Sequence, residues 1–202
     1  MSDACCSVPP PPRDNLSYRR VLWIALVANV VMFVVELAAS IFSGSSALAA
    51  DALDFLGDSA NYALSLGALA AGGAWISRVA LLKGTAMSLY GIAVLAYAAW
   101  RAWLGVPPEP ITMGVVGALA LAVNFGVAAL LYRFREGDAN MRSVWLCTRN
   151  DVIANLAVLV AAAGVFGTGT IWPDVGVAAM LALLGLSSGR VVIRQARAEL
   201  SA

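Results

Sequence analysis

Long apolar segments alternate with short breaks along almost the whole chain. Breaks such as FSGSS, GVPPEP and GTGTIWPD contain the glycines and prolines that end helices. A helix needs about 20 predominantly apolar residues to cross roughly 30 Å of hydrocarbon, and six segments reach that length. The pattern predicts six transmembrane helices, over residues 21–43, 46–73, 79–100, 111–134, 143–168 and 171–194.

The composition supports this pattern. Of the 202 residues, 61% are hydrophobic and 12% are charged, and the mean hydropathy is +0.82. Soluble domains have about 25% charged and about 45–50% apolar residues. No soluble core of this size could bury so much apolar surface, so the surrounding solvent must be lipid. The expected fold class is an all-α polytopic membrane protein, built as a six-helix bundle.

The two ends of the chain are short. Residues 1–20 (MSDACCSVPPPPRDNLSYRR) are polar and rich in proline, which predicts a flexible tail. They lack the charged start, apolar region and cleavage site of a signal peptide. Residues 21–198 form the predicted transmembrane domain. Because the chain stops soon after the sixth span, no soluble C-terminal domain is expected.

Basic residues are concentrated on one side of the predicted bundle. With the N-terminus inside, the external loops hold Arg101 alone, and Arg149 falls within the fifth span. This asymmetry predicts that both termini lie in the cytoplasm. We expect a multi-pass protein of the plasma membrane, which is the inner membrane in a Gram-negative bacterium. The basic residues assigned to cytoplasmic segments are Arg13, Arg19, Arg20, Arg78, Lys83, Arg133, Arg135, Arg142, Arg190, Arg194 and Arg197.

The composition argues against several functional classes. The net charge is +1 and no basic run is interleaved with aromatic residues, so no nucleic-acid partner is expected. The three cysteines, Cys5, Cys6 and Cys147, do not suggest a disulfide framework. Histidine is absent, which removes the commonest proton carrier near neutral pH. No nucleophile and base pair is evident, so we expect neither enzymatic activity nor a prosthetic group.

Three acids interrupt the second span, in the run DALDFLGD. An aspartate at the centre of an inserted helix costs roughly 2.5–3.5 kcal/mol, and its short side chain cannot reach the interface. Asp51, Asp54 and Asp58 are spaced by three and four residues and therefore lie on one helical face. That face must point into the bundle or into a water-filled cavity. For Asp51, an equally good interpretation is a cap near the outer end of the helix.

The fifth span carries a second polar stripe. Cys147, Asp151 and Asn155 recur every four residues. At about 1.5 Å of rise per residue, Asp151 lies at the depth of Asp58 in the second span, within about one turn. Carboxylates from two helices therefore face each other near the middle of the membrane, which predicts a cation site.

The side chains restrict the choice of cation. Zinc accepts four ligands from carboxylate, thiolate or imidazole groups. Asp54, Asp58, Asp151 and Cys147 would form an O₃S set suited to zinc or cadmium. Asn155 in place of Cys147 would form an all-oxygen set, more tolerant of manganese or iron. The residues alone leave the fourth ligand open.

Two segments resemble a known family, the cation diffusion facilitators, which are divalent-metal/proton antiporters. SGSSALAADALDFLGDSANYALSL is similar to the family's second helix, with its ALLADA signature, a ligand, three residues and an aspartate. MRSVWLCTRNDVIANLAVLVAA is similar to the fifth helix, with its pattern of histidine, three residues and aspartate. The resemblance implies that Asp54, Asp58, Cys147 and Asp151 are the metal ligands.

The sequence departs from the family pattern in two respects. Zinc-transporting members carry histidine at the positions of Asp54 and Cys147, so the resemblance leaves the metal undetermined. Members also have a cytoplasmic metal-binding domain after the sixth helix, and its absence here would make this a short form. A homodimer would then be held by membrane helices, through small-residue stretches such as GALAAGG and GVVGALA.

The predicted function is that of a secondary transporter. It would export zinc or cadmium, or alternatively manganese, iron or cobalt, from the cytoplasm in exchange for protons. Metal entry should release protons, because buried carboxylates bind either protons or a cation. Glu36 in the first span would carry a proton or line the access path, and Asp51 would serve metal or proton exit. A passive divalent-cation channel and a membrane metal sensor are the alternatives for the same site.

Overall fold

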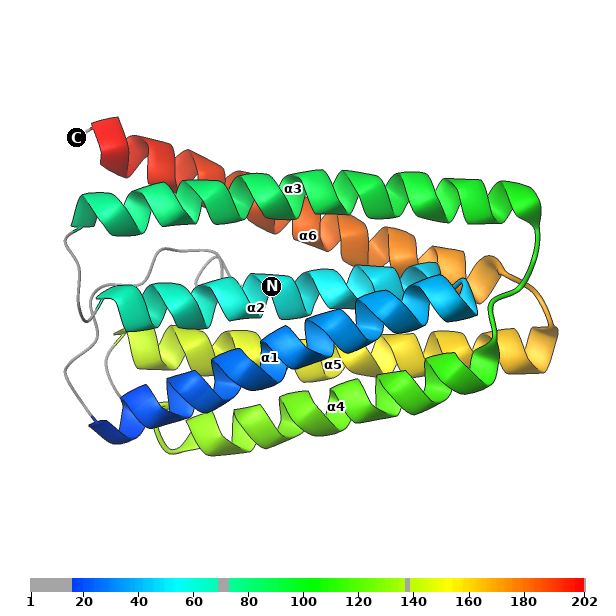
Figure 1. Ribbon diagram of the computed structural model, residues 1–202, viewed down its shortest axis with the longest axis horizontal. Helices are drawn as coiled ribbons and strands as arrows, with labels where there is room; N and C mark the ends of the chain where they lie inside the picture. Colours follow the sequence, from blue (N-terminus) through cyan, green and yellow to red (C-terminus); the bar gives the residue numbers. More distant parts are fainter. Residues whose placement is uncertain (1–15, 69–72, 137–138, 202) are drawn as a thin grey trace.

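The protein is a bundle of six α-helices joined by short connections (Figure 1). The computed structural model describes residues 16–68, 73–136 and 139–201, and these contain no β-strand. Residues 1–15, which include Cys5 and Cys6, lie outside the described part. The helices are α1 (Leu16–Ser43), α2 (Ser46–Ala68), α3 (Gly73–Leu104), α4 (Pro110–Tyr132), α5 (Ala139–Thr168) and α6 (Trp172–Ser201).

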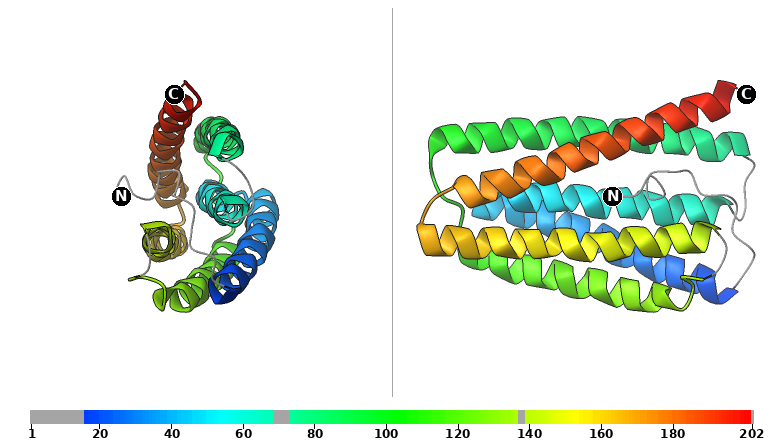
Figure 2. Two further views of the ribbon diagram at one scale, coloured as in Figure 1. Left: turned by 90° about the vertical axis from the view of Figure 1, so that its left-hand side faces the viewer. Right: turned by 180° about the vertical axis from the view of Figure 1, so that it is seen from behind.

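Consecutive helices run in opposite directions, so α1 begins and α6 ends at the same end of the bundle, on the left in Figure 1. We call this the terminal end and the opposite one the far end. Viewed along the helices, α2 lies at the centre, with α3 and α6 to one side and α1, α4 and α5 to the other (Figure 2). Helix α2 contacts α1, α3, α5 and α6.

Five of the described helices are long and apolar enough to cross a membrane, namely α1, α3, α4, α5 and α6. Helix α2 does not meet that standard, because Asp51, Asp54 and Asp58 lower its hydropathy. Its central position explains how it tolerates these acids, since its neighbours separate them from lipid. The prediction of an all-α membrane bundle is confirmed, and the helix that carries three aspartates is the innermost.

Glycines allow α3 and α6 to approach closely. A Cβ atom added at Gly84 would lie 3.0 Å from the Gly189 carbonyl oxygen, and one added at Gly189 would lie 3.0 Å from the Gly84 carbonyl oxygen. Side chains at either position would push the two backbones apart. Small residues at helix contacts are a common solution in membrane proteins, where close packing replaces the hydrophobic driving force.

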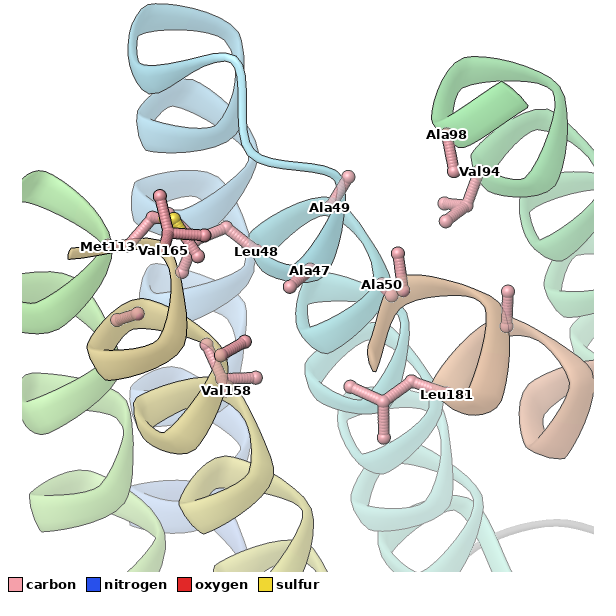
Figure 3. Close-up of a cluster of buried hydrophobic side chains, with 14 of the residues drawn as sticks. Ala47, Leu48, Ala49, Ala50, Val94, Ala98, Met113, Val158, Val165 and Leu181 are labelled. Carbon is pink, nitrogen blue, oxygen red and sulfur yellow. The ribbon is translucent and has the colours of Figure 1, made fainter. Parts of the chain in front are cut away.

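The far half of the bundle is closed by a cluster of small and branched apolar side chains (Figure 3). The first turns of α2 supply residues 47–50, all of them buried. Leu181 of α6, Val158 of α5 and Met113 of α4 pack around them. We call this set of residues, together with its other members from α1 and α3, the far cluster. Alanine side chains bring the helices close together here, so the far cluster forms a seal.

Two acidic residues at the far end satisfy helix-start amide groups. Asp174, in the first turn of α6, accepts hydrogen bonds from Ser45 Oγ at 2.6 Å, from the Ser46 amide at 2.8 Å and from the Ala47 amide at 3.0 Å. Glu109 caps α4 by accepting from the Ile111 and Thr112 amides, at 2.9 and 2.6 Å. Hydrogen bonds from the side chain and amide of Thr112 and from the Ile111 amide hold the pKa of Glu109 below its usual value.

Several helices begin or end a few residues away from their predicted bounds. Residues 16–20, assigned to the flexible tail, form the start of α1, because Tyr18 is fully buried with its ring 5.0 Å from that of Phe134. Helix α3 begins at Gly73, six residues before its predicted start, and α6 continues to Ser201, past the predicted end at residue 194. The α6 extension, QARAELS, consists mainly of good helix formers.

Candidate metal centre

A small polar pocket lies between α2, α3, α5 and α6, from the middle of the bundle toward the terminal end. Its volume is about 50 Å³, enough for a few water molecules or one partly hydrated ion. It is lined by Asp54, Gly57, Asp58, Asn61, Lys83, Met87, Cys147, Asn150, Asp151, Gly185, Ser188 and Val192.

The four ligands implied by the family resemblance all line this pocket. Asp54 and Asp58 stand one turn apart on α2, and Cys147 and Asp151 stand one turn apart on α5. Asp58 and Asp151 face each other within hydrogen-bonding reach. Cys147 is a free, buried thiol.

These donors surround a space and do not form a closed coordination shell. Within the described ranges, no three histidine, cysteine, aspartate or glutamate side chains lie close enough together to hold a metal ion. A metal ion in the pocket would therefore draw the side chains of α2 and α5 inward.

A hydrogen-bond chain orients one of the acids. The Tyr62 hydroxyl donates to Asp58 Oδ2 at 3.0 Å and lies 2.7 Å from Thr148 Oγ1, which in turn donates to the Val144 carbonyl oxygen at 3.1 Å. All four residues are buried. Such second partners fix the direction of a ligand carboxylate. Neither Tyr62 nor Thr148 was predicted as a site residue, although Tyr62 lies four residues after Asp58, on the same face of α2.

The position of Lys83 differs more from its prediction than that of any other residue discussed. It was assigned to the cytoplasmic basic residues, but its side chain is only 8% exposed and lines the pocket. Its ammonium group donates to Asn61 Oδ1 and lies within electrostatic reach of Asp58. A lysine near the end of a membrane helix normally extends toward water. Here α3 turns it toward α2 instead.

Three further predicted residues lie outside the pocket, about one turn toward the far end. Glu36, Asp51 and Asn155 are each fully buried. Asn155 Nδ2 donates to Asp51 Oδ1 at 3.4 Å, so the structure groups Asn155 with Asp51 and places Cys147 with the pocket acids. The alternative of Asp51 as a helix cap is wrong. Helix α2 begins five residues earlier, and Asp174 bonds its first amides.

The chain is also similar to known proteins. The profile of the family described as "cation efflux transmembrane domain" matches residues 22–78 and 73–201. The chain is similar to the metal cation efflux system protein CzcD of Cupriavidus metallidurans, with 26% identity over 178 residues, which are 81% of this chain and 56% of that protein. It is also similar to a cadmium, cobalt and zinc/H(+)-K(+) antiporter of Bacillus velezensis, with 25% identity over 189 residues, 86% of this chain and 60% of that one.

The chain spans a little over half the length of these curated relatives. The family profile, in contrast, covers almost the whole of the described bundle, including α2 and α5 with the pocket acids. The protein therefore belongs to the cation efflux, or cation diffusion facilitator, family.

Proposed function

We propose that the protein is a secondary transporter that exports a divalent transition-metal ion from the cytoplasm in exchange for protons. One observation carries the proposal. In a membrane bundle of the cation efflux family, three carboxylates and one thiol line a single small pocket, and they come from two facing helices. The names of the similar proteins, a metal cation efflux protein and a cadmium, cobalt and zinc antiporter, support the same class of substrate.

The proposed ligands are Asp54, Asp58, Cys147 and Asp151. Three carboxylate oxygens and one sulfur suit zinc or cadmium, which combine oxygen and sulfur ligands readily. Cobalt, manganese and iron are the next candidates, and the oxygen-rich set favours them more than a site with two thiolates would.

The charges of the pocket support exchange for protons. The three carboxylates and the Lys83 ammonium leave a formal charge of −2 when every group is ionised. One divalent ion or two protons would neutralise this charge, and charge is expensive at the centre of a membrane. We therefore expect two carboxylate protons to replace each metal ion, together with the Cys147 proton when the thiolate binds the metal.

The packing supports alternating access. The apolar far cluster closes the bundle on the far side of the pocket, beyond Asp51 and Asn155, so this conformation favours entry from the terminal end. The positive-inside rule assigns that end to the cytoplasm. Export requires a second conformation in which the far cluster separates and the terminal end closes. We also expect a plasma-membrane location and a homodimer formed through the membrane helices.

The test is metal flux in proteoliposomes that contain the purified full chain. Zinc or cadmium uptake should saturate, should be accompanied by proton movement in the opposite direction, and should be lost in Asp58→Asn. Flux that does not saturate and is independent of the pH gradient would indicate a channel. Binding without flux would indicate a sensor. Full transport by Asp58→Asn would refute the site.

A further inference from the structure

A second group of acidic and amide side chains lies between the pocket and the far cluster. Glu36 comes from α1, Asp51 from α2 and Asn155 from α5, and none of the three has any exposed surface. None lines the metal pocket. On α2, Asp51 lies three residues before Asp54, or about 4.5 Å along the helix. On α5, Asn155 lies four residues after Asp151, or about 6 Å.

The oxygens of this group have few partners. Both carboxylate oxygens of Glu36, Oδ2 of Asp51 and Oδ1 of Asn155 are buried and receive no hydrogen bond of regular geometry from the described residues. Neither carboxylate forms an ion pair within the same ranges. A buried polar atom without a partner costs roughly 1–3 kcal/mol, and more when it is charged. Four such atoms in one place indicate that something else satisfies them during the working cycle.

Asp51 lies close to both other members of this group. Glu36 and Asp51 lie within hydrogen-bonding reach of each other. The Asn155 amide nitrogen donates to Asp51 Oδ1 at 3.4 Å and to the Asp151 carbonyl oxygen at 2.8 Å, which leaves its own oxygen available. Tyr90, within electrostatic reach of Glu36, donates its hydroxyl hydrogen to the Ala49 carbonyl oxygen at 3.0 Å. Two acids and one amide grouped around Asp51, with no ion pair to either acid among the described residues, form an oxygen-only ligand set for a divalent ion.

We propose that Glu36, Asp51 and Asn155 form a second cation site, one helical turn nearer the far end than the metal pocket, which receives the divalent ion as it leaves. This inference rests on the proposed function. The site lacks sulfur and has one amide, so it should bind zinc or cobalt more weakly than the pocket does. A transport path works when each site binds strongly enough to admit the ion and weakly enough to release it.

The position of Asn155 connects the two sites. Through one amide nitrogen it holds both the backbone of Asp151, a pocket residue, and the side chain of Asp51. The far cluster begins next to this group on its far-end side, with residues 47–50 on α2 and Val158 on α5. The second site is therefore closed toward the far end in this conformation and would open only when the far cluster separates.

The test measures Co²⁺ binding to the purified full chain in detergent. The Asp58→Asn/Asp151→Asn double variant disables the pocket. This background should still bind one Co²⁺ per chain, with the weak absorption of octahedral, oxygen-ligated cobalt and no sulfur-to-cobalt charge-transfer band. Adding Glu36→Gln should weaken this binding by about tenfold or more. Adding Asn29→Ala, which removes an equally buried polar side chain two turns away on α1, should leave it unchanged.

Each result decides the question. No Co²⁺ bound to the background variant overturns the second site, and so does Co²⁺ binding that is insensitive to Glu36→Gln. If Glu36→Gln does not elute as a single folded species, Asp51→Asn takes its place. The wild-type chain separates this inference from the proposed function. If the wild-type chain binds one Co²⁺ and the background variant binds none, the proposed transporter stands and the second site is refuted. If Glu36→Gln alone abolishes the binding of that one ion, the pocket is refuted as the metal site.

Discussion

Helix α2 contributes residues 47–50 to the far cluster, and over the next eight residues it contributes Asp54, Gly57 and Asp58 to the metal pocket. In the first stretch, alanine side chains bring neighbouring helices together and exclude water. In the second, a glycine and two acids leave space and line it with charge. The comparison shows that a single central helix supplies both the seal and the site, so a change in its position affects both at once.

The largest expected effect comes from comparing substitutions of two acids, one in the pocket and one at the far end. Asp151→Asn should weaken zinc binding by about a hundredfold, because the site loses a charged ligand. Asp174→Asn should leave zinc affinity unchanged and lower the free energy of unfolding by about 1 kcal/mol, as expected for a weakened helix cap. Calorimetric titration and thermal unfolding in detergent measure the two effects. Loss of zinc affinity in Asp174→Asn but not in Asp151→Asn would show that the metal binds at the far end.

Lys83→Met tests whether the pocket needs the positive charge of the lysine side chain. Transport should fall by about tenfold, because a loaded site with three carboxylates would keep one negative charge inside the membrane. Equilibrium zinc binding should persist, since the substitution removes a charge that repels the metal. Lys83→Arg is the matched control and should transport at close to the wild-type rate. Parallel loss of binding and transport in Lys83→Met would show that Lys83 is needed for folding of the site.

Tyr62→Phe, set against Tyr90→Phe, compares a buried phenol with a partly buried one. Tyr62 holds Asp58 in the pocket, whereas Tyr90 bonds the Ala49 carbonyl oxygen in the far half. Removing the Tyr62 hydroxyl should weaken zinc binding by about tenfold, because Asp58 loses its orienting partner. Tyr90→Phe should not change zinc affinity. Equal effects of the two substitutions would show that orientation of Asp58 contributes little.

The smallest expected effect concerns Glu109, which is exposed at the far end. Because hydrogen bonds lower its pKa in the folded protein, its contribution to stability is present above the unfolded value of about 4.3 and is lost as pH falls through the folded value. Glu109→Gln should therefore unfold at a slightly lower temperature than wild type at neutral pH. The difference should disappear in acid. A difference that does not change with pH would assign the effect to packing.

The sequence predicted those parts of the molecule that depend on local spacing. The six helices follow from apolar segments, and the acidic face of α2 follows from intervals of three and four residues. The pairing of Asp58 with Asp151 follows from the helix rise and the membrane thickness. These quantities are properties of one helix at a time, or of two helices in one bilayer.

The residues that were missed depend on how the helices are rotated against each other. Gly84 packs on Gly189 of α6, which fixes the rotation of α3 and turns the neighbouring Lys83 toward Asn61. Nothing near Lys83 in the sequence specifies that rotation. Similarly, the first amides of α2, which Asp51 would bond as a helix cap, are bonded by Asp174. This residue lies more than 120 residues away in the chain.

The bonds of Asp174 also have a mechanical consequence. Both of its oxygens are attached to the start of α2, so α6 and α2 are joined at the far end as two arms are joined at a pivot. A small change in the angle between them moves the far-end atoms little, and the displacement grows with distance along each helix. Asn61 and Val192, which line the pocket on the terminal side, lie well along these arms. A rotation about this joint that closes the terminal mouth would therefore leave the Asp174 hydrogen bonds in place.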